Sequence, residues 1–247
     1  MSNGGATTGT STASGCPGTG GPSMVKLPQG YCIDSTEVTR SQYAAWLSTI
    51  SANAINTQDS TNCSWNTTFT PDATCMASSD VCQGTACGNH PQACVDWCDA
   101  YVYCKGVGKR LCGAIAGGQV AFASYADSTT SQWYSACSSA GTFAYPYGNT
   151  RSTTICNGPD YWAANATLTT TSVGSLTGCQ APSPYDGVYD LSGNVDEWED
   201  SCDGTGRTSL CRIRGGAFAM SGLACGDQAE ATRGLASGVV GFRCCAP

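Results

Sequence analysis

The chain has 247 residues, of which only 12% are charged, and its 11 Lys and Arg are outnumbered by 18 Asp and Glu. This length suits one sizeable core, and the net charge of −7 excludes a basic surface for nucleic acid. No apolar run is long enough to cross a bilayer. The scarcity of Glu and Lys argues against a helical bundle, so we expect an α+β, irregular and loop-rich fold with little regular secondary structure.

Cysteine is the most informative residue type, with 18 copies, an even number. Their spacing and the single histidine do not fit zinc knuckles, and so many thiols are a liability in a reducing compartment. We therefore expect mostly disulfides, of unknown connectivity, in an extracytoplasmic protein that is secreted, periplasmic or at the cell surface. Met1 runs directly into a Ser-Asn-Gly-Gly stretch without basic or apolar regions, so we expect that an export signal has been removed.

The first 22 residues are of low complexity and rich in Gly, Ser and Thr, a composition typical of a flexible tether. We expect a tail over 1–22, containing Cys16, and one folded domain over 23–247. Such a tail is also a candidate for attachment to a neighbouring subunit.

Short strands are predicted at 24–27 and 31–34, followed by a helix. Thr39 and Gln42 form a capping box at the start of this helix. Apolar side chains at helical spacing then predict one buried face, formed by Tyr43, Trp46, Leu47 and Ile50.

Residues 51–93 carry four cysteines without periodicity and predict a long, disulfide-linked loop. A second helix is expected to begin near Asp96, capped by Asp96 and Asp99, and to end at Gly106 and Gly108. A small helix is expected at 132–137 and a last strand at 239–243, with short strands and turns elsewhere.

Four stretches then occur in order: 31–39, containing Asp-x-x-Glu-Val-Thr; 90–111, opening with His90-Pro91; 189–198, containing Gly-Asn-Val-x-Glu-Trp; and the closing pair 214–216 and 241–244. Together they resemble the formylglycine-generating-enzyme (sulfatase-modifying factor) superfamily, a variant of the C-type-lectin-like fold, across residues 24–245. The cysteine content suggests a disulfide-rich, secreted bacterial branch. Residues 112–130 form an insertion before Trp133, which matches the central Trp of a family helix.

The resemblance assigns structural roles to several residues in these signatures. Asp34, Glu37, Arg214 and Arg243 are expected to form buried Arg–carboxylate pairs that stabilise the fold. The other signature positions are Gly215, Gly216, Gly241 and Phe242. His90 is expected to be a structural histidine.

The family's oxidase chemistry uses two cysteines, five residues apart, that bind Cu(I) and oxidise a substrate cysteine. In this chain those positions fall on Met220 and Cys225. A neutral thioether in place of one thiolate weakens such a site. We therefore expect Cys225 in a disulfide, Met220 in packing and no bound copper, with an altered Met/Cys oxidase as the alternative. Relatives that hold iron with three histidines are excluded, because the chain has only His90.

A calcium site is predicted at the turn of the third stretch. The resemblance implies ligands at Asp190, Gly193, Val195 and Glu197. Two carboxylates and two carbonyls would form an all-oxygen shell, which Ca²⁺ prefers. A weaker second site is predicted near Asn157 and Gly158. The alternative is an ordinary turn in which Glu197 accepts backbone hydrogen bonds.

The sequence thus predicts a secreted or cell-surface, calcium-binding and non-catalytic binding or structural module, a pseudoenzyme of the superfamily. Its ligand would be a protein, a peptide or a glycan, and Trp65 and Trp162 in predicted loops are candidate contacts. The alternatives are the altered copper oxidase and a subunit of an extracellular assembly joined through the N-terminal tail.

Overall fold

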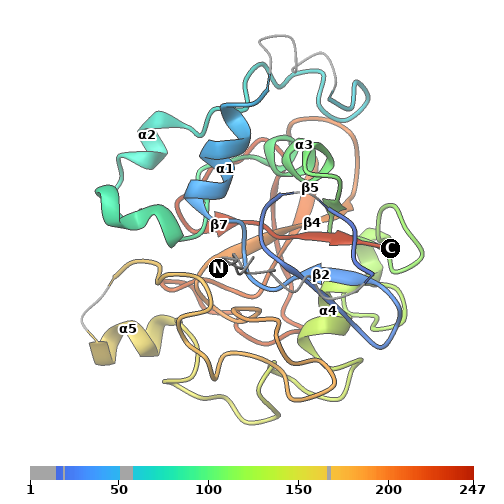
Figure 1. The fold of residues 1–247 in the computed structure, drawn as a ribbon, viewed down its shortest axis with the longest axis vertical. Helices are drawn as coiled ribbons and strands as arrows, with labels where there is room; N and C mark the ends of the chain where they lie inside the picture. Colours follow the sequence, from blue (N-terminus) through green and yellow to red (C-terminus); the bar gives the residue numbers. More distant parts are fainter. Residues whose placement is uncertain (1–14, 19, 51–57, 166–167) are drawn as a thin grey trace, which may run out of the picture.

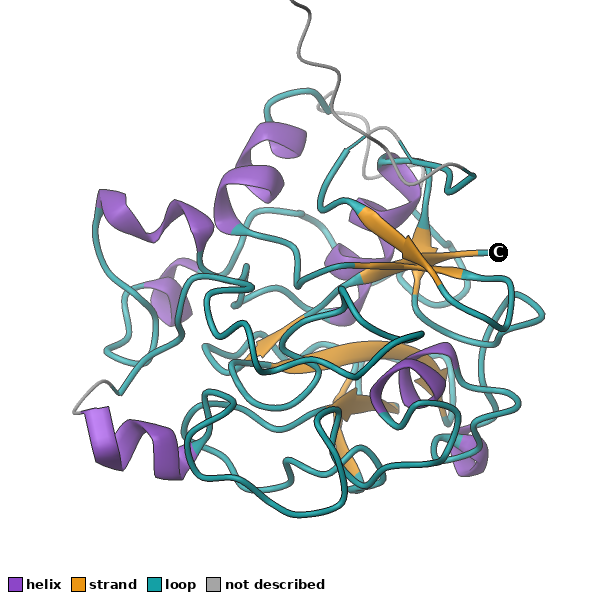
Figure 2. Cartoon of the chain, turned by 60° about the horizontal axis from the view of Figure 1, so that its bottom comes forward, coloured by secondary structure: helices purple, strands orange, loops and turns teal. Residues whose placement is uncertain are grey.

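The computed structural model describes residues 15–18, 20–50, 58–165 and 168–247. It confirms the predicted α+β, loop-rich class. Figure 2 shows short strands at the centre, helices around them and loops over most of the remaining chain. Within the described residues, no helix has both the length and the apolar character needed to span a membrane.

Two small sheets form the centre of the molecule. The first has the order β1-β2-β8-β3 and consists of β1 (Met24–Lys26), β2 (Cys32–Asp34), β8 (Cys244–Ala246) and β3 (Arg110–Leu111). The second has the order β6-β5-β4-β7 and consists of β6 (Ala229–Thr232), β5 (Leu210–Arg214), β4 (Asp196–Cys202) and β7 (Val240–Gly241). All pairs are antiparallel except β4 and β7. Because β2 pairs with β8, the two ends of the domain lie side by side.

The helices are short. They are α1 (Arg40–Leu47), α2 (Ala73–Met76), α3 (Trp97–Gly106), α4 (Gln132–Cys137) and α5 (Pro159–Asn165), with 3-10 turns η2 (Thr85–Asn89) and η3 (Phe122–Ser124). Figure 1 places α1, α2 and α3 in the upper half of the molecule and α5 at the lower left. The capping boxes predicted at Thr39 and Asp96 are both present, so local sequence sets where α1 and α3 begin.

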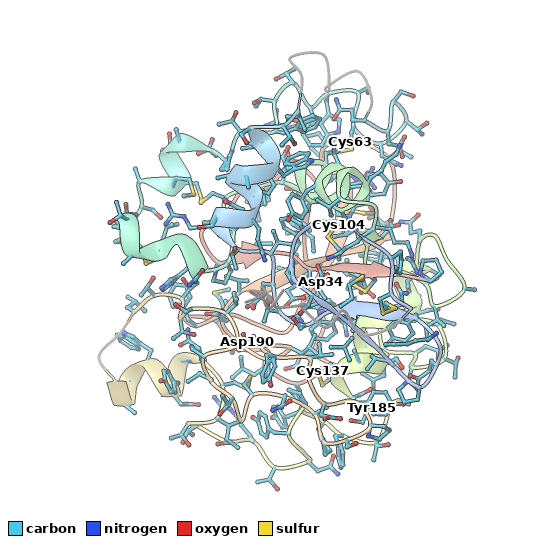
Figure 3. All side chains as sticks on the ribbon, in the orientation of Figure 1. Asp34, Cys63, Cys104, Cys137, Tyr185 and Asp190 are labelled. Atoms are coloured by element: carbon cyan, nitrogen blue, oxygen red, sulfur yellow. A yellow bond between two sulfur atoms is a disulfide. The ribbon has the colours of Figure 1, made fainter. Side chains whose placement is uncertain are left out.

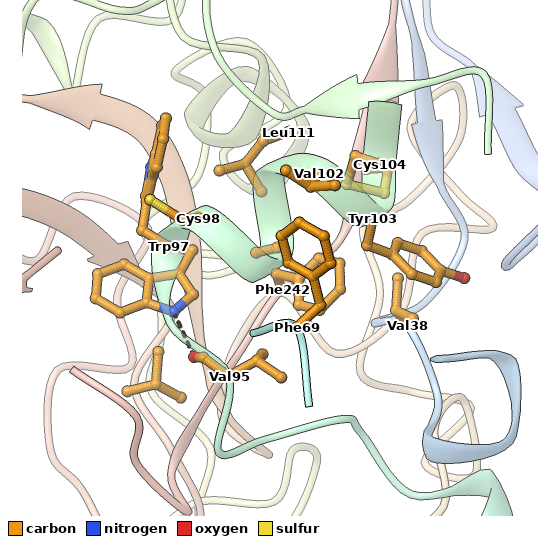
Figure 4. Close-up of a cluster of buried hydrophobic side chains, with 14 of the residues drawn as sticks. Val38, Phe69, Val95, Trp97, Cys98, Val102, Tyr103, Cys104, Leu111 and Phe242 are labelled. Carbon is orange, nitrogen blue, oxygen red and sulfur yellow. Dashed lines mark hydrogen bonds between the residues drawn. A yellow bond between two sulfur atoms is a disulfide. The ribbon is translucent and has the colours of Figure 1, made fainter. Parts of the chain in front are cut away.

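The main core lies between α1, α3 and the second sheet. Its centre is aromatic: Tyr43 stacks on Tyr103 with ring centroids 5.3 Å apart, and Phe242 packs edge-on against both rings. Figure 4 shows part of this cluster, with a dashed line at the carbonyl of Val95. The donor to this carbonyl is the indole N–H of Trp198, at 3.1 Å. Such pairs add to the burial of apolar area, so this half is stabilised mainly by packing.

A second, smaller core cluster lies in the lower half, around Trp133 and Tyr31. In Figure 3, Cys137 and Tyr185 lie in this half, Cys63 and Cys104 in the upper half, and Asp34 and Asp190 between them. Irregular loops cover the lower half (Figure 1).

All 18 cysteines form disulfides, which confirms the prediction of pairing. The nine pairs are Cys16–Cys32, Cys63–Cys98, Cys75–Cys94, Cys82–Cys87, Cys104–Cys244, Cys112–Cys245, Cys137–Cys225, Cys156–Cys179 and Cys202–Cys211. Cys104–Cys244 and Cys112–Cys245 join α3 and the start of the 112–130 insertion to β8. Long closed loops of this kind restrict the unfolded chain most.

Three sequence predictions differ from the structure. The predicted tail includes Cys16, which is bonded to Cys32 of β2, and the carbonyl of Pro22 accepts a hydrogen bond from Lys109 Nζ. The boundary at residue 22 is therefore too late. Residues 1–14 and 19 of the tail, and 51–57 of the predicted loop, lie outside the described residues.

The other two differences concern helices. The loop predicted over 51–93 contains α2 and η2. Helix α5, which begins with Pro159, was missed, so Trp162 lies on a helix and not in a loop. Proline is favoured at the first position of a helix, and that signal was present in the sequence.

Candidate functional sites

The centre of the predicted calcium turn is a buried ion pair. Glu197, on β4, accepts hydrogen bonds from Arg243 Nε at 2.7 Å and from Arg243 Nη2 at 2.6 Å. The Trp133 indole donates a third, at 2.9 Å to Glu197 Oε2. Both charged side chains are at most 1% exposed. Bidentate hydrogen bonding between an arginine and a carboxylate is a strong interaction and holds the buried carboxylate in place.

The remaining donors of Arg243 bind the backbone. Nη1 donates to the carbonyl of Asp34 and Nη2 to that of Tyr189. The Asp34 carboxylate itself binds Lys109 Nζ at 2.5 Å and the backbone N–H of Cys244 at 2.9 Å. Burial raises the pKa of Asp34 to about 6, although Lys109 counteracts the rise. Arg243 thus joins β2, β4 and the segment leading to β8.

The predicted Arg–carboxylate pairs exist, but with other partners. Arg243 binds Glu197 and not Asp34 or Glu37. Arg214 lies 3.9 Å from Glu199 and donates to the carbonyl of Cys225 at 2.6 Å. The sequence could not assign these partners, because the pairing across the sheets and the segment before β8 is set by the tertiary fold.

Glu37 and Asp190 form a second part of this buried cluster. Glu37 Oε1 accepts a hydrogen bond from Asn194 Nδ2 at 2.9 Å, and Asp190 Oδ2 accepts one from the backbone of Gly174 at 2.6 Å. Burial raises the pKa of Glu37 well above its usual range and that of Asp190 to about 6, and the charge of Asp190 raises the Glu37 pKa further. Two carboxyl groups in such a site favour a shared proton over two negative charges.

The two predicted calcium segments meet at this cluster. The N–H of Asn194 donates to the carbonyl of Asn157 at 2.7 Å, and Asn157 Nδ2 donates to Asn194 Oδ1 at 3.1 Å. Gly193 has φ of +78°, and a Cβ there would lie 2.3 Å from the Asn157 carbonyl oxygen. Gly158 follows on the same packed segment, so the two predicted sites are one polar region.

These residues do not fit a calcium shell in this conformation. Glu197 is occupied by three side-chain donors, and the guanidinium of Arg243 places a positive charge where a cation would have to bind. Val195 is fully buried beside the cluster. Among the residues that the structure describes, no group of three or more His, Cys, Asp or Glu side chains is placed to hold a metal. The alternative prediction gave Glu197 backbone N–H partners, whereas its three hydrogen bonds come from the side chains of Arg243 and Trp133.

The residues predicted at the copper position do not fit copper either. Cys225 is bonded to Cys137 and is 1% exposed, so its sulfur is not a thiolate. Met220 is 48% exposed, which corrects the prediction that it packs in the interior. The signature glycines nearby permit close contacts: a Cβ at Gly215 would lie 3.2 Å from the carbonyl oxygen of Leu191, and one at Gly216 would lie 2.9 Å from that of Gly222.

His90, Gly241 and Phe242 make contacts within the packed fold. His90 Nδ1 and the Thr170 hydroxyl are 2.8 Å apart, and burial lowers the His90 pKa. Gly241 lies in β7, where a Cβ would lie 3.0 Å from the carbonyl oxygen of Gln92. Phe242 belongs to the aromatic core.

An open cavity at the N-terminus of α3 was not predicted as a site. Its volume is about 380 Å³, and Trp65, Asn66, Asp96, Asp99 and Arg207 are among its lining residues. The sequence marked Trp65 as a candidate contact and Asp96 and Asp99 as a helix cap. Nothing in the sequence indicated that Arg207, from the β4–β5 connection, would also line the cavity.

The fold defines a disulfide-linked α+β domain in which the signature residues form a buried ionic centre. Comparison with known proteins identifies the family of this domain. A family model described as "Sulfatase-modifying factor enzyme 1-like domain" matches residues 2–246. The chain belongs to this family, the formylglycine-generating-enzyme superfamily to which its signatures were assigned. No curated protein sequence matches the chain significantly.

Solved structures with the same fold are distant in sequence. CarF is 18% identical with a TM-score of 0.54, and the match covers 94% of this chain and 96% of CarF. PvdO from Pseudomonas aeruginosa is 20% identical with a TM-score of 0.53, covering 87% and 79%. Treponema denticola variable protein 1 is 18% identical with a TM-score of 0.51, covering 94% and 92%. At these identities the comparison establishes the fold, and function rests on the sites.

Proposed function

We propose that this protein is a non-catalytic binding module of its family, working outside the cytoplasm as a secreted or cell-surface protein. The observation that carries this proposal is the Cys137–Cys225 disulfide. It occupies the only cysteine at the two copper positions of the family, since the other position holds Met220.

Copper oxidation of a substrate cysteine needs soft thiolate ligands on the protein. Every cysteine in this chain is paired. A disulfide sulfur carries no negative charge and is a poor ligand, and the thioether of Met220 is neutral and solvent-exposed. The chain therefore offers no pair of thiolates at the position where the oxidase would need them.

The disulfides also support the location. Nine bridges in a chain of 247 residues are typical of an oxidising compartment, and a reducing one would open them. Calcium is not part of the proposal, because Glu197, on which the predicted site depends, is bound to Arg243.

The test is an oxidation assay. The purified protein is incubated in air with Cu(I), a thiol reductant at a concentration that leaves the disulfides intact, and a cysteine-containing peptide. Mass spectrometry of the peptide is expected to show no conversion, and competition with a Cu(I) chelator no specific copper binding. Conversion of the peptide by the unmodified protein, lost in Cys225→Ser, would overturn the proposal.

A further inference from the structure

The cavity at the N-terminus of α3 has the dimensions of a ligand site. Its volume of about 380 Å³ falls within the range of roughly 300–1,000 Å³ that is usual for small-molecule sites. The walls come from four parts of the chain: residues 65–73, residues 94–99 at the start of α3, the β4–β5 connection that carries Arg207, and residues 234–236 after β6. Cys63–Cys98 holds the first wall to the second, so the cavity is built into a cross-linked frame.

One wall is aromatic. Trp65 is partly buried, and its indole N–H donates to the carbonyl of Asn62 at 3.0 Å, which fixes the ring. The guanidinium of Arg207 lies over this ring at 5.5 Å from its centroid. The Arg207 side chain packs along Gly234, where a Cβ would lie 2.5 Å from Arg207 Cγ. The cavity therefore has an indole in its wall with the positive guanidinium of Arg207 over the ring.

The lining also includes two carboxyl groups, those of Asp96, which is partly buried, and of Asp99, which is 5% exposed. Asp96 accepts the N–H of Asp99 at 3.0 Å, and Asp99 accepts the N–H of Asp96 at 3.2 Å and Asn66 Nδ2 at 2.9 Å. The two oxygens of a carboxyl group have about four acceptor positions, so both groups can take part in further hydrogen bonds. Burial raises the pKa of Asp96 to about 6 and that of Asp99 well above its usual range. Exposed hydroxyls of Thr67, Thr68 and Thr70 surround these groups.

The cavity is lined by groups of both charges, which restricts the charge of the ligand that it can bind. An anion would face the carboxylates of Asp96 and Asp99, and a cation would face Arg207. A neutral molecule with several hydroxyl groups satisfies both walls, because hydroxyls donate to carboxylates and accept from a guanidinium. Such a molecule with an apolar C–H face also packs against an indole ring.

We infer that this cavity binds a neutral sugar unit, stacked on Trp65, with its hydroxyl groups held between the Asp96/Asp99 carboxylates and Arg207. This inference names a ligand for the binding role proposed above. Its test is independent of the oxidation assay, since neither copper nor any cysteine takes part.

Saturation-transfer NMR with single sugars as probes tests this inference. Glucose, galactose, mannose and N-acetylglucosamine are the neutral probes, and glucosamine and glucuronate offer the same ring with a positive or a negative charge. At least one neutral sugar is expected to bind saturably, with a dissociation constant of about 1 mM, as is usual for a single small polar unit. Both charged sugars are expected to bind at least about tenfold more weakly.

Variants locate the site. Trp65→Leu and Arg207→Met are each expected to weaken binding about tenfold or more. Trp162→Leu, which removes a 36% exposed indole on α5 outside the cavity, is the matched control and should bind as the wild type does. Arg207 is exposed, so Arg207→Met decides the question if Trp65→Leu fails to fold.

Three results would overturn the inference: no binding of any neutral sugar, tighter binding of glucosamine or glucuronate than of every neutral sugar, or neutral-sugar binding that survives Arg207→Met.

Discussion

Two regions of this protein contain clustered carboxyl groups next to an arginine, and the two regions differ in how accessible these groups are. Around Arg243, the carboxylates of Glu197 and Asp34 are nearly inaccessible and are bound by fixed internal donors. Around Arg207, the carboxyl groups of Asp96, which is partly buried, and Asp99, which is 5% exposed, line an open cavity. The residue types alone therefore do not make a binding site. What matters is whether the protein itself already uses their hydrogen-bonding capacity.

The two regions also differ in how much each arginine contributes to the stability of the fold. A buried ion pair is costly to form, but removal of one partner leaves a charge without solvent or counter-charge. An exposed arginine at a cavity rim contributes little to stability, because water replaces its contacts. The two arginines are therefore a matched pair for experiments.

The largest effect is expected from Arg243→Met compared with Arg207→Met. Arg243→Met leaves Glu197 buried with only the Trp133 indole as a partner, and we expect a loss of about 3–5 kcal/mol in the free energy of unfolding. Arg207→Met should stay within about 0.5 kcal/mol of the wild type. Urea unfolding under non-reducing conditions measures both. Similar losses in the two variants would show that the cavity is also structural.

A smaller effect is expected from Asp96→Asn, and it depends on pH. Burial raises the Asp96 pKa to about 6, whereas that of an unfolded Asp is about 3.9. Between these values the folded state binds more protons, so this group makes stability fall as pH rises from about 4 to about 6. The slope is at most about 1.4 kcal/mol per pH unit for one proton.

Asn caps a helix as well as Asp does, so Asp96→Asn should match the wild type at about pH 4 and exceed its stability at neutral pH. Urea midpoints measured across this range give the result. Parallel pH profiles for the two proteins would contradict a raised Asp96 pKa.

The smallest effect is expected from calcium. Because Arg243 holds Glu197, we expect neither EGTA nor added Ca²⁺ to move the melting temperature by more than about 1 °C. Differential scanning calorimetry with and without the ion measures this. A calcium-dependent rise that disappears in Glu197→Gln would restore the sequence prediction and would require Arg243 to move away.

The sequence by itself determined the elements whose signals are local. The capping boxes at Thr39 and Asp96, the buried face of α1 and the paired state of the cysteines could all be read along the chain, because each depends on neighbouring residues or on composition. The order of the four signatures was sufficient for the family, since motifs keep their sequence even when distant in space.

Only the tertiary structure decided what the charged residues do. Glu197 lies on β4 and Arg243 in the segment between β7 and β8, and Trp65 meets Arg207 only because the disulfide-linked loop folds over the N-terminus of α3. A carboxylate predicted to bind calcium is neutralised by an arginine 46 residues away. Electrostatic partners are set by distance in space, and pairings across β4, β5 and the loops leave no periodicity in the sequence.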